Sequence, residues 1–171
     1  GDVVAIESAE ARPSDPEIDA AVEAIREELA PARALERAGR YAEAHAILEP
    51  IAARVDELGF APLVAEIGPV WGYVLERTNQ SAEAEAAWKH AVEVGVEHGP
   101  PGPASRSAGM LVTHLTAQDA RFAEAEAWAS MGVSLARRAG RGSAAEAYAL
   151  NRRGGLYLER ARWDDAERDY Q

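Results

Sequence analysis

The stretch "GRYAEAHAIL" at residues 39–48 recurs along the chain in altered form. The near-copies are "QSAEAEAAW" at 80–88, "ARFAEAEAW" at 120–128 and "ARWDDAERDY" at 161–170. Aligning the copies places four residues in register, spaced by 40, 41 and 41 positions: Tyr41, Ser81, Phe122 and Trp163. A period of this length is typical of a repeat array, in which each unit is one supersecondary element that packs on its neighbours.

Each copy is predicted to begin an amphipathic helix. In the first copy the apolar residues step by three or four: Tyr41, Ala44, Leu48, Ile51, Val55 and Leu58. This spacing draws one apolar stripe along a helix. Another helical stretch precedes each copy, near 18–38, 61–78, 104–118 and 144–160. Each unit is therefore predicted to be a helix, a tight turn and a second helix, and the fold class is all-α.

An alanine stands three positions after each of the four aligned residues Tyr41, Ser81, Phe122 and Trp163. We call these the register alanines: Ala44, Ala84, Ala125 and Ala166. A helix that crosses a neighbour closely tolerates only a small side chain at the point of contact. These alanines are predicted to mark the crossings.

The turns and helix ends carry recognisable signals. Gly39 and Asn79 occupy turn positions that favour a positive φ, whereas Ala120 and Ala161 suit the same place less well. The glycines expected to close helices in a left-handed conformation are Gly59, Gly99 and Gly140. "GPPGP" at 99–103 is expected to separate two units, and Ser143 with Glu146 is expected to form a capping box.

Three prolines fall inside predicted helices: Pro31, Pro50 and Pro69. Proline in a helix interior removes a backbone donor and clashes with the preceding turn. We therefore expect bends at these points.

Composition excludes several functional classes. The formal net charge is -11 and Lys89 is the only lysine, so contact with a phosphate backbone or a basic membrane-binding face is not expected. No apolar run approaches the roughly 20 residues that span a bilayer. There is no cysteine, which excludes disulfides and thiolate metal sites.

The repeated residues resemble the tetratricopeptide repeat (TPR). In "RGGLYLERARWDDAERDY" the residues at the family's small, large and aromatic positions are Gly154, Tyr157, Ala161, Trp163, Ala166 and Tyr170. The observed period exceeds the family's usual length of about 34 residues. The resemblance implies a right-handed superhelical solenoid of TPR-like repeats. Residues 1–17 would be a linker or arm, and the repeats would span 18–59, 60–99, 104–140 and a truncated 143–171.

A narrower resemblance lies in the order of segments from "DPEIDAAVEAIREELAPARALERAGRYAEAHAILEP" to "LGFAPLVAEI". This order is similar to the repeat region that follows the catalytic domain of large bacterial serine/threonine protein kinases. It implies a non-catalytic signalling module, cytoplasmic or attached to a membrane-anchored parent. ATP and Mg²⁺ would belong to the parent's kinase domain, because the chain contains no glycine-rich phosphate loop, HRD or DFG.

No catalytic or metal-ligating residues are assigned. His90, Glu93 and Glu97 share a helix face, but the ligand inventory favours a solvated face. The acidic group Asp164, Asp165 and Glu167 is interpreted as a favourable first helical turn rather than an acid–base pair.

The tryptophans could form an aromatic ligand cage or belong to the core. Trp88 and Trp163 occupy repeat-defining apolar positions and are expected in the core. The pattern does not decide between core and surface for Trp71 and Trp128, and either could be exposed.

The candidate binding site is the concave groove that the resemblance places on the first helices. Its residues are Arg33, Arg37, Tyr73, Arg77, Met110, His114, Tyr148, Asn151 and Arg152. Such a groove could hold a peptide, with arginine pairing to acidic groups; a merely solvated face is the alternative. Lys89 lies on a second helix, so a lysine-rich carboxylate clamp is not evident.

The predicted function is a protein-interaction or regulatory module. One alternative is a small-ligand sensor with a pocket lined by Tyr73, His114 and Tyr148; an all-helical enzyme is the least favoured. We also expect a homodimer through the uncapped fourth repeat, because an unpaired solenoid end leaves apolar surface exposed.

Overall fold

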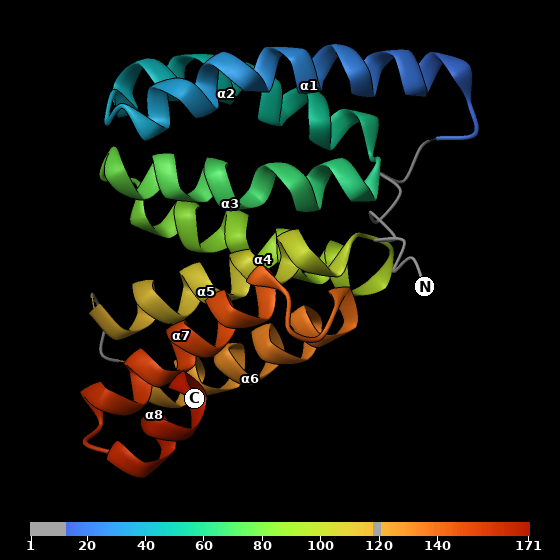
Figure 1. Cartoon of the computed structure of the whole chain (residues 1–171). Helices are drawn as coiled ribbons and strands as arrows, with labels where there is room; N and C mark the ends of the chain where they lie inside the picture. Colours follow the sequence, from blue (N-terminus) through green and yellow to red (C-terminus); the bar gives the residue numbers. More distant parts are fainter. Residues whose placement is uncertain (1–12, 118–120) are drawn as a thin grey trace.

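The computed structural model describes residues 13–117 and 121–171, and over these residues the chain is helical throughout (Figure 1). The described residues form eight helices: α1 (Pro16–Arg37), α2 (Tyr41–Leu58), α3 (Ala61–Arg77), α4 (Ser81–Glu97), α5 (Pro101–Ala117), α6 (Phe122–Ala139), α7 (Ala144–Glu159) and α8 (Trp163–Tyr170). Every second helix of a pair begins at the residue predicted from the repeat. The all-α prediction is confirmed.

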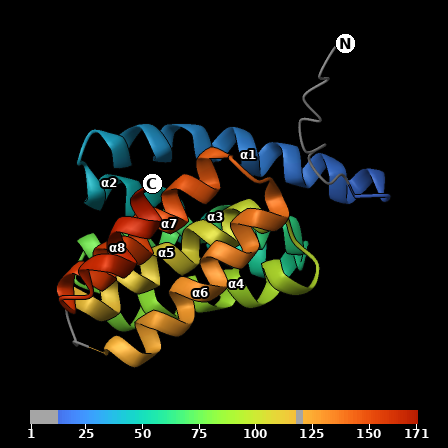
Figure 2. The same ribbon diagram turned by 60° about the horizontal axis from the view of Figure 1, so that its bottom comes forward.

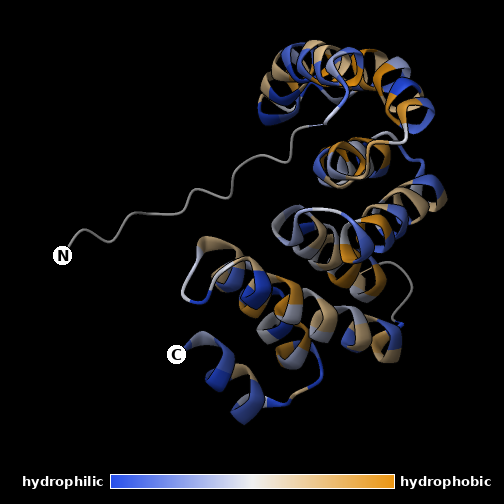
Figure 3. Ribbon diagram, turned by 90° about the vertical axis from the view of Figure 1, so that its right-hand side faces the viewer, coloured by the Kyte–Doolittle hydropathy of each residue, from blue (hydrophilic) through white to orange (hydrophobic). Residues whose placement is uncertain are grey.

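Consecutive helices pack on one another and build a solenoid. Figure 1 shows α1 and α2 at the top of the stack and α8 at the bottom. In Figure 2, where the bottom of the stack is turned forward, α7 and α8 lie in front of α3 and α5. Seen from the side, the pairs follow a curve, and apolar residues gather between the helices (Figure 3). The chain therefore has one face on which the odd-numbered helices lie together.

Small residues set how closely the helices approach. The register alanines Ala44, Ala84, Ala125 and Ala166 are all buried, as predicted. A second set of close contacts joins the two helices of one unit. A Cβ added at Gly72 would lie 2.3 Å from Nε1 of Trp88, and one added at Gly154 would lie 2.8 Å from Cζ of Tyr170. The large residue of the second helix thus fills the space that glycine leaves on the first.

The tryptophans divide between core and surface. Trp88 is 0% exposed, which confirms the core prediction, and Trp71 packs partly buried against two core clusters. Trp128 is also half-buried. The core prediction is wrong for Trp163, which is 63% exposed. The equivalent aromatic of the first unit, Tyr41, packs on Tyr73 of the following unit, with ring centroids 5.9 Å apart. Trp163 has no such neighbour, because no described helix follows α8.

The tight turns adopt the left-handed backbone that the sequence predicts. The φ values are 74° at Gly39, 63° at Asn79 and 53° at Ala161, while Ala120 lies outside the described residues. An L-residue such as alanine pays a steric cost there, because its Cβ crowds the following carbonyl oxygen.

Replacing Ala161 with glycine is expected to raise the free energy of unfolding by about 0.5–1 kcal/mol, since relief of strain exceeds the entropy gained by the unfolded chain. Urea denaturation followed by circular dichroism measures the change. The reverse substitution, Gly39→Ala, is the control. Its new Cβ would meet nothing within 4 Å, so backbone strain without any steric clash should lower the free energy of unfolding by a similar amount. Equal stability of Ala161→Gly and the wild type would contradict the prediction.

The predicted helix closures are partly wrong. Gly59 caps α2 in the left-handed conformation, with φ 63° and ψ 17°, as expected. Gly99 has no such role, because α4 already ends at Glu97 and His98 is its cap. Instead a Cβ at Gly99 would lie 2.8 Å from Cα of Gly95, so this glycine is needed for close packing. Gly140 caps α6 with φ 153° and ψ 126°, outside the left-handed helical region.

Two helices begin earlier than predicted. α1 begins at Pro16, where Oδ1 of Asp15 accepts a hydrogen bond from the Glu17 amide at 2.9 Å. Of the rest of the predicted arm, residues 13–15 precede the helix and residues 1–12 lie outside the described part of the chain. α5 begins at Pro101, inside the expected breaker "GPPGP". Proline is tolerated in a first helical turn because the amide it lacks would have no helical partner there.

The interior prolines do not end their helices. Pro31, Pro50 and Pro69 lie within α1, α2 and α3, each of which is a continuous helix.

Only one of the two hydrogen bonds of the predicted capping box is present. Oγ of Ser143 accepts a hydrogen bond from the Glu146 amide at 3.2 Å. The Glu146 carboxylate reaches the Gly142 amide and Arg137 Nε, both at 2.7 Å, rather than the amide of Ser143.

Candidate functional site

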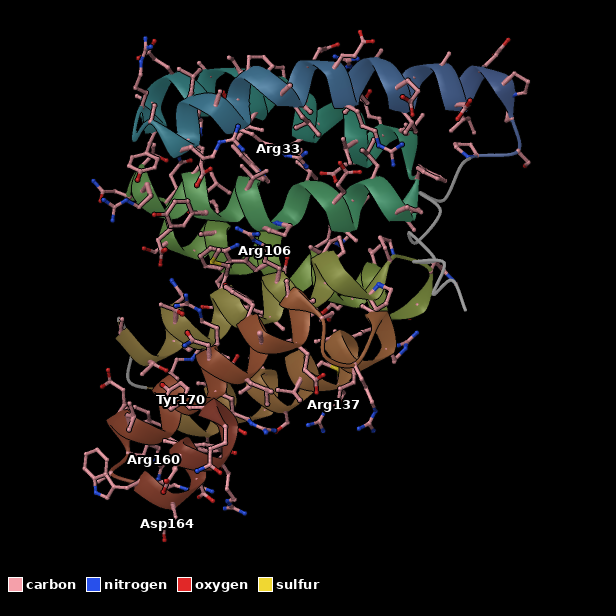
Figure 4. All side chains as sticks on the ribbon, viewed as in Figure 1. Arg33, Arg106, Arg137, Arg160, Asp164 and Tyr170 are labelled. Atoms are coloured by element: carbon pink, nitrogen blue, oxygen red, sulfur yellow. The ribbon has the colours of Figure 1, made fainter. Side chains whose placement is uncertain are left out.

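A groove of about 1020 Å³ runs along the odd-numbered helices. It is built from α1, α3, α5 and α7 because the second helix of each unit packs behind the first. Figure 4 labels two of its side chains, Arg33 on α1 and Arg106 on α5. Six of the nine residues predicted for the groove line it: Arg33, Arg37, Tyr73, Met110, Tyr148 and Arg152.

Three predicted groove residues lie elsewhere. Arg77 is exposed and its guanidinium carbon lies 5.0 Å from the ring centre of Tyr41. Asn151 lines a separate hollow of about 230 Å³ that also contains Tyr170. His114 is only 3% exposed and lines neither hollow. A ligand pocket lined jointly by Tyr73, His114 and Tyr148 is therefore not formed.

His114 belongs to a polar network inside the solenoid. Its Nδ1 lies 3.0 Å from Oε1 of Glu76, and its Nε2 lies 3.6 Å from Oε2 of Glu85. The imidazole meets the ring of Trp88 edge-on at 5.6 Å. The two carboxylates come from α3 and α4, so the histidine turns inward towards partners that only the packing of three helices provides.

Glu85 is the most perturbed carboxylate of this network. Arg121 Nη1 lies 2.8 Å from its Oε2 and Lys89 Nζ lies 2.6 Å from its Oε1. The hydrogen bond from Arg121, followed by that from Lys89, lowers the pKa of Glu85 from 4.5 to about 2 against the opposing effect of burial. The ionised carboxylate thus favours the folded state.

The stabilisation that Glu85 provides is expected to be complete above about pH 4.5 and to be lost as the pH falls towards about 2, because the unfolded chain then binds the proton first. Urea unfolding across this range measures the loss. Glu85→Gln should be less stable than the wild type near neutral pH and should show a shallower decline with acid. Parallel acid profiles for the two proteins would contradict the assignment.

Several groove residues were missed by the sequence analysis. They are Glu36, Glu66, Pro69, Val70, Glu76 and Arg106, together with small or hydroxyl residues of α5 and α7. Many lie about one helical turn from a predicted residue, as Arg106 does from Met110. The spacing of three or four residues along a helix face could have found these.

The groove has an apolar strip and two differently charged walls. Pro69, Val70 and Met110 supply the apolar surface. On the α1–α3 wall, Arg33 Nη2 is paired with Glu66 Oε1 at 3.1 Å. On the α5–α7 wall, burial raises the pKa of Tyr148, with the charge of Arg152 acting in the opposite direction. The phenol is therefore neutral at ordinary pH and can act as a donor.

Other polar clusters carry no site. Within residues 13–117 and 121–171 no group of three or more histidine or acidic side chains is placed to hold a metal ion. His90 lies 4.0 Å from Asp56, on another helix. Asp165 is paired with Arg162 and Arg168, in agreement with its interpretation as a first-turn residue. In the described part of the chain no helix has both the length and the apolar character needed to cross a membrane.

Comparison with known proteins adds no assignment. No protein-family model matches the chain, and no curated protein matches it.

Proposed function

We propose that this protein is a non-catalytic interaction module that binds a peptide segment of a partner protein in the groove of the odd-numbered helices. The observation that carries the proposal is the groove itself, about 1020 Å³ in volume and lined by four helices of successive units. Its volume is at the upper end of the range for small-molecule pockets, roughly 300–1,000 Å³. A continuous surface across several units suits a chain segment better than a compact ligand.

The chemistry of the lining supports the same function. The apolar strip of Pro69, Val70 and Met110 offers contact area for a side chain of the ligand. Arginines on both walls and glutamates on the α1–α3 wall can orient the polar groups of the ligand. Peptide-binding grooves combine these features, since apolar contact supplies affinity and polar contacts supply register.

The resemblance to TPR arrays of bacterial serine/threonine kinases supports a more specific setting. In that setting the module would recruit partners or substrates for a kinase domain encoded in the same gene. Sequencing the coding region around this segment tests the proposal, because a kinase domain carries HRD and DFG motifs. An upstream region without them would contradict it.

Selection from a random-peptide library displayed on phage tests the groove function. The wild type is expected to enrich related peptides, and Met110→Asp is expected to lose them, because a carboxylate in the apolar strip must be desolvated when a peptide docks. Affinities of the synthesised peptides follow from fluorescence anisotropy, and circular dichroism verifies that the variant is folded.

Met131→Asp is the matched control. Met131 is 41% exposed on α6 and lines neither hollow, so the same substitution there should leave peptide binding unchanged. Absence of any enriched peptide, or binding that survives Met110→Asp, would overturn the proposal.

A homodimer through the α7–α8 end is a second proposal. The exposed apolar side chains there, Leu158, Trp163 and Tyr170, support it. Light scattering at increasing concentration should show a dimer that Trp163→Ala weakens. A wild type that stays monomeric at high concentration would contradict it.

A further inference from the structure

Among the described residues, three arginines that line the groove make no ion pair: Arg37 of α1, Arg106 of α5 and Arg152 of α7. Arg106 of α5 and Arg152 of α7 flank Tyr148, with guanidinium carbons 5.8 and 5.0 Å from its ring centre. Among the described residues neither makes an ion pair, although the chain as a whole has a net charge of -11. On the facing wall, Arg33 is paired with Glu66. Unpaired arginines facing a groove in so acidic a chain indicate that their charge serves a ligand.

Hydrogen-bonding capacity is also unused at this place. The hydroxyl of Tyr148 and Nε of Arg152 are both buried and find no partner among the described residues. A buried donor without a partner destabilises the folded state, because it has lost its hydrogen bond to water and gained none in return. Arg152 stacks on the Tyr148 ring, and its Nη1 donates a long hydrogen bond of 3.5 Å to Oγ1 of Thr113. The side chain can therefore turn towards a ligand with little loss.

The carboxylates of the groove lie on the other side. Glu36, Glu66 and Glu76 belong to α1 and α3, whereas the lining residues of α5 and α7 include no acid. The α1–α3 wall also carries Arg33 and Arg37, so its charges largely offset one another, whereas the α5–α7 wall carries two guanidiniums and no acid. An acidic ligand group would therefore be attracted most strongly at the α5–α7 wall. The position of a bound acidic group is thereby specified.

From these observations we infer that Arg106 and Arg152 form a receptor for a carboxylate of an acidic segment in the partner protein, with Tyr148 between them. The inference rests on the proposed peptide-binding function. A planar guanidinium donates two parallel hydrogen bonds to a carboxylate, and two guanidiniums hold it from two sides. The neighbouring strip of Pro69, Val70 and Met110 would take an apolar side chain close to the acidic one.

The composition of the selected peptides is the first test. The net charge of -11 attracts basic peptides to the protein as a whole. Enrichment of glutamate or aspartate would run against this attraction and would therefore report on the two arginines. We expect an acidic residue at a fixed position beside an apolar one. The best peptide is then synthesised in three versions, with glutamate, glutamine or phosphoserine at that position.

The variants Arg106→Gln and Arg152→Gln should each weaken binding of the glutamate peptide by about tenfold. The wild type should already bind the glutamine peptide weakly, and the arginine variants should bind it with nearly the same affinity as the wild type does. In a double-mutant cycle this non-additivity shows that the glutamate and the arginine interact directly. Tyr148→Phe should weaken binding by a smaller factor. The matched control is Arg138→Gln, which removes the same charge from an exposed arginine of α6 that lines neither hollow.

The outcomes separate this inference from the groove function. Peptides that bind in a Met110-dependent way but show no acidic residue, or whose affinity ignores Arg106→Gln and Arg152→Gln, overturn the carboxylate receptor and leave the groove function standing. Binding of the phosphoserine version alone also overturns the carboxylate assignment. A library that yields no peptide at all overturns both.

Discussion

Trp88→Ala is expected to lower the free energy of unfolding by about 3–5 kcal/mol, the range found when a large aromatic is removed from a packed core. Trp88 is fully buried, and its ring fills the space left by Gly72 on α3 while meeting His114 on α5 edge-on at 5.6 Å. The substitution therefore leaves a cavity where three helices meet. Urea denaturation followed by circular dichroism measures the loss.

Trp163→Ala is the matched control for this prediction. The same side-chain atoms are removed at the start of α8, from a side chain that is 63% exposed. Surface substitutions of this kind usually change the stability of a monomer by no more than about 0.5 kcal/mol. Both variants are therefore compared at a concentration at which light scattering shows the monomer, because dimerisation would add to the apparent stability of the wild type. Similar losses in the two variants would mean that burial does not distinguish the positions and would contradict the packing described for α3, α4 and α5.

Gly68→Ala should destabilise the chain by about 2 kcal/mol, although alanine is the better helix former by roughly 1 kcal/mol. A Cβ at Gly68 would lie 2.1 Å from Cβ of Ala91 and 3.3 Å from Oγ of Ser107. Because the Cβ of Ala91 is fixed to its backbone, α3 and α4 would have to move apart. The expected result is a lower urea midpoint with an unchanged far-ultraviolet spectrum.

Gly155→Ala controls for helix propensity. Gly155 also lies inside a helix, α7, and nothing lies within 4 Å of the Cβ that alanine would add there. Alanine should therefore stabilise this position by up to about 1 kcal/mol. If Gly68→Ala stabilised the protein as well, the close approach of α3 to α4 would be refuted.

The repeat period was sufficient to predict the helix pairs. The starts of α2, α4, α6 and α8 agree with the sequence prediction because the apolar stripe and the register alanine are properties of one segment. A crossing point that admits only a small side chain recurs wherever the same pair of helices recurs. The positive φ at Gly39 and Asn79 was also predictable, because glycine and asparagine adopt this conformation more easily than other residues do.

The candidate site was only partly predictable for a different reason. The family resemblance located the groove face well enough to identify Arg37, Met110 and Arg152, but a position on a helix face cannot say which polar residues turn inward. His114 is buried because Glu76 and Glu85 arrive from other helices. Arg106 was missed although it lies one turn from Met110 on the same helix.

The sequence by itself determined the period, the helices and the small residues at their crossings, because these follow from local spacing and side-chain size. Only the tertiary structure decided which side chains are exposed, which charges are paired and which remain unpaired. Trp163 is exposed because nothing described covers α8. The Glu146 carboxylate accepts hydrogen bonds from Arg137 of α6 and from the Gly142 amide, and not from the Ser143 amide that a capping box requires. Burial and pairing depend on atoms that belong to other segments, and their positions become known only when the helices are packed.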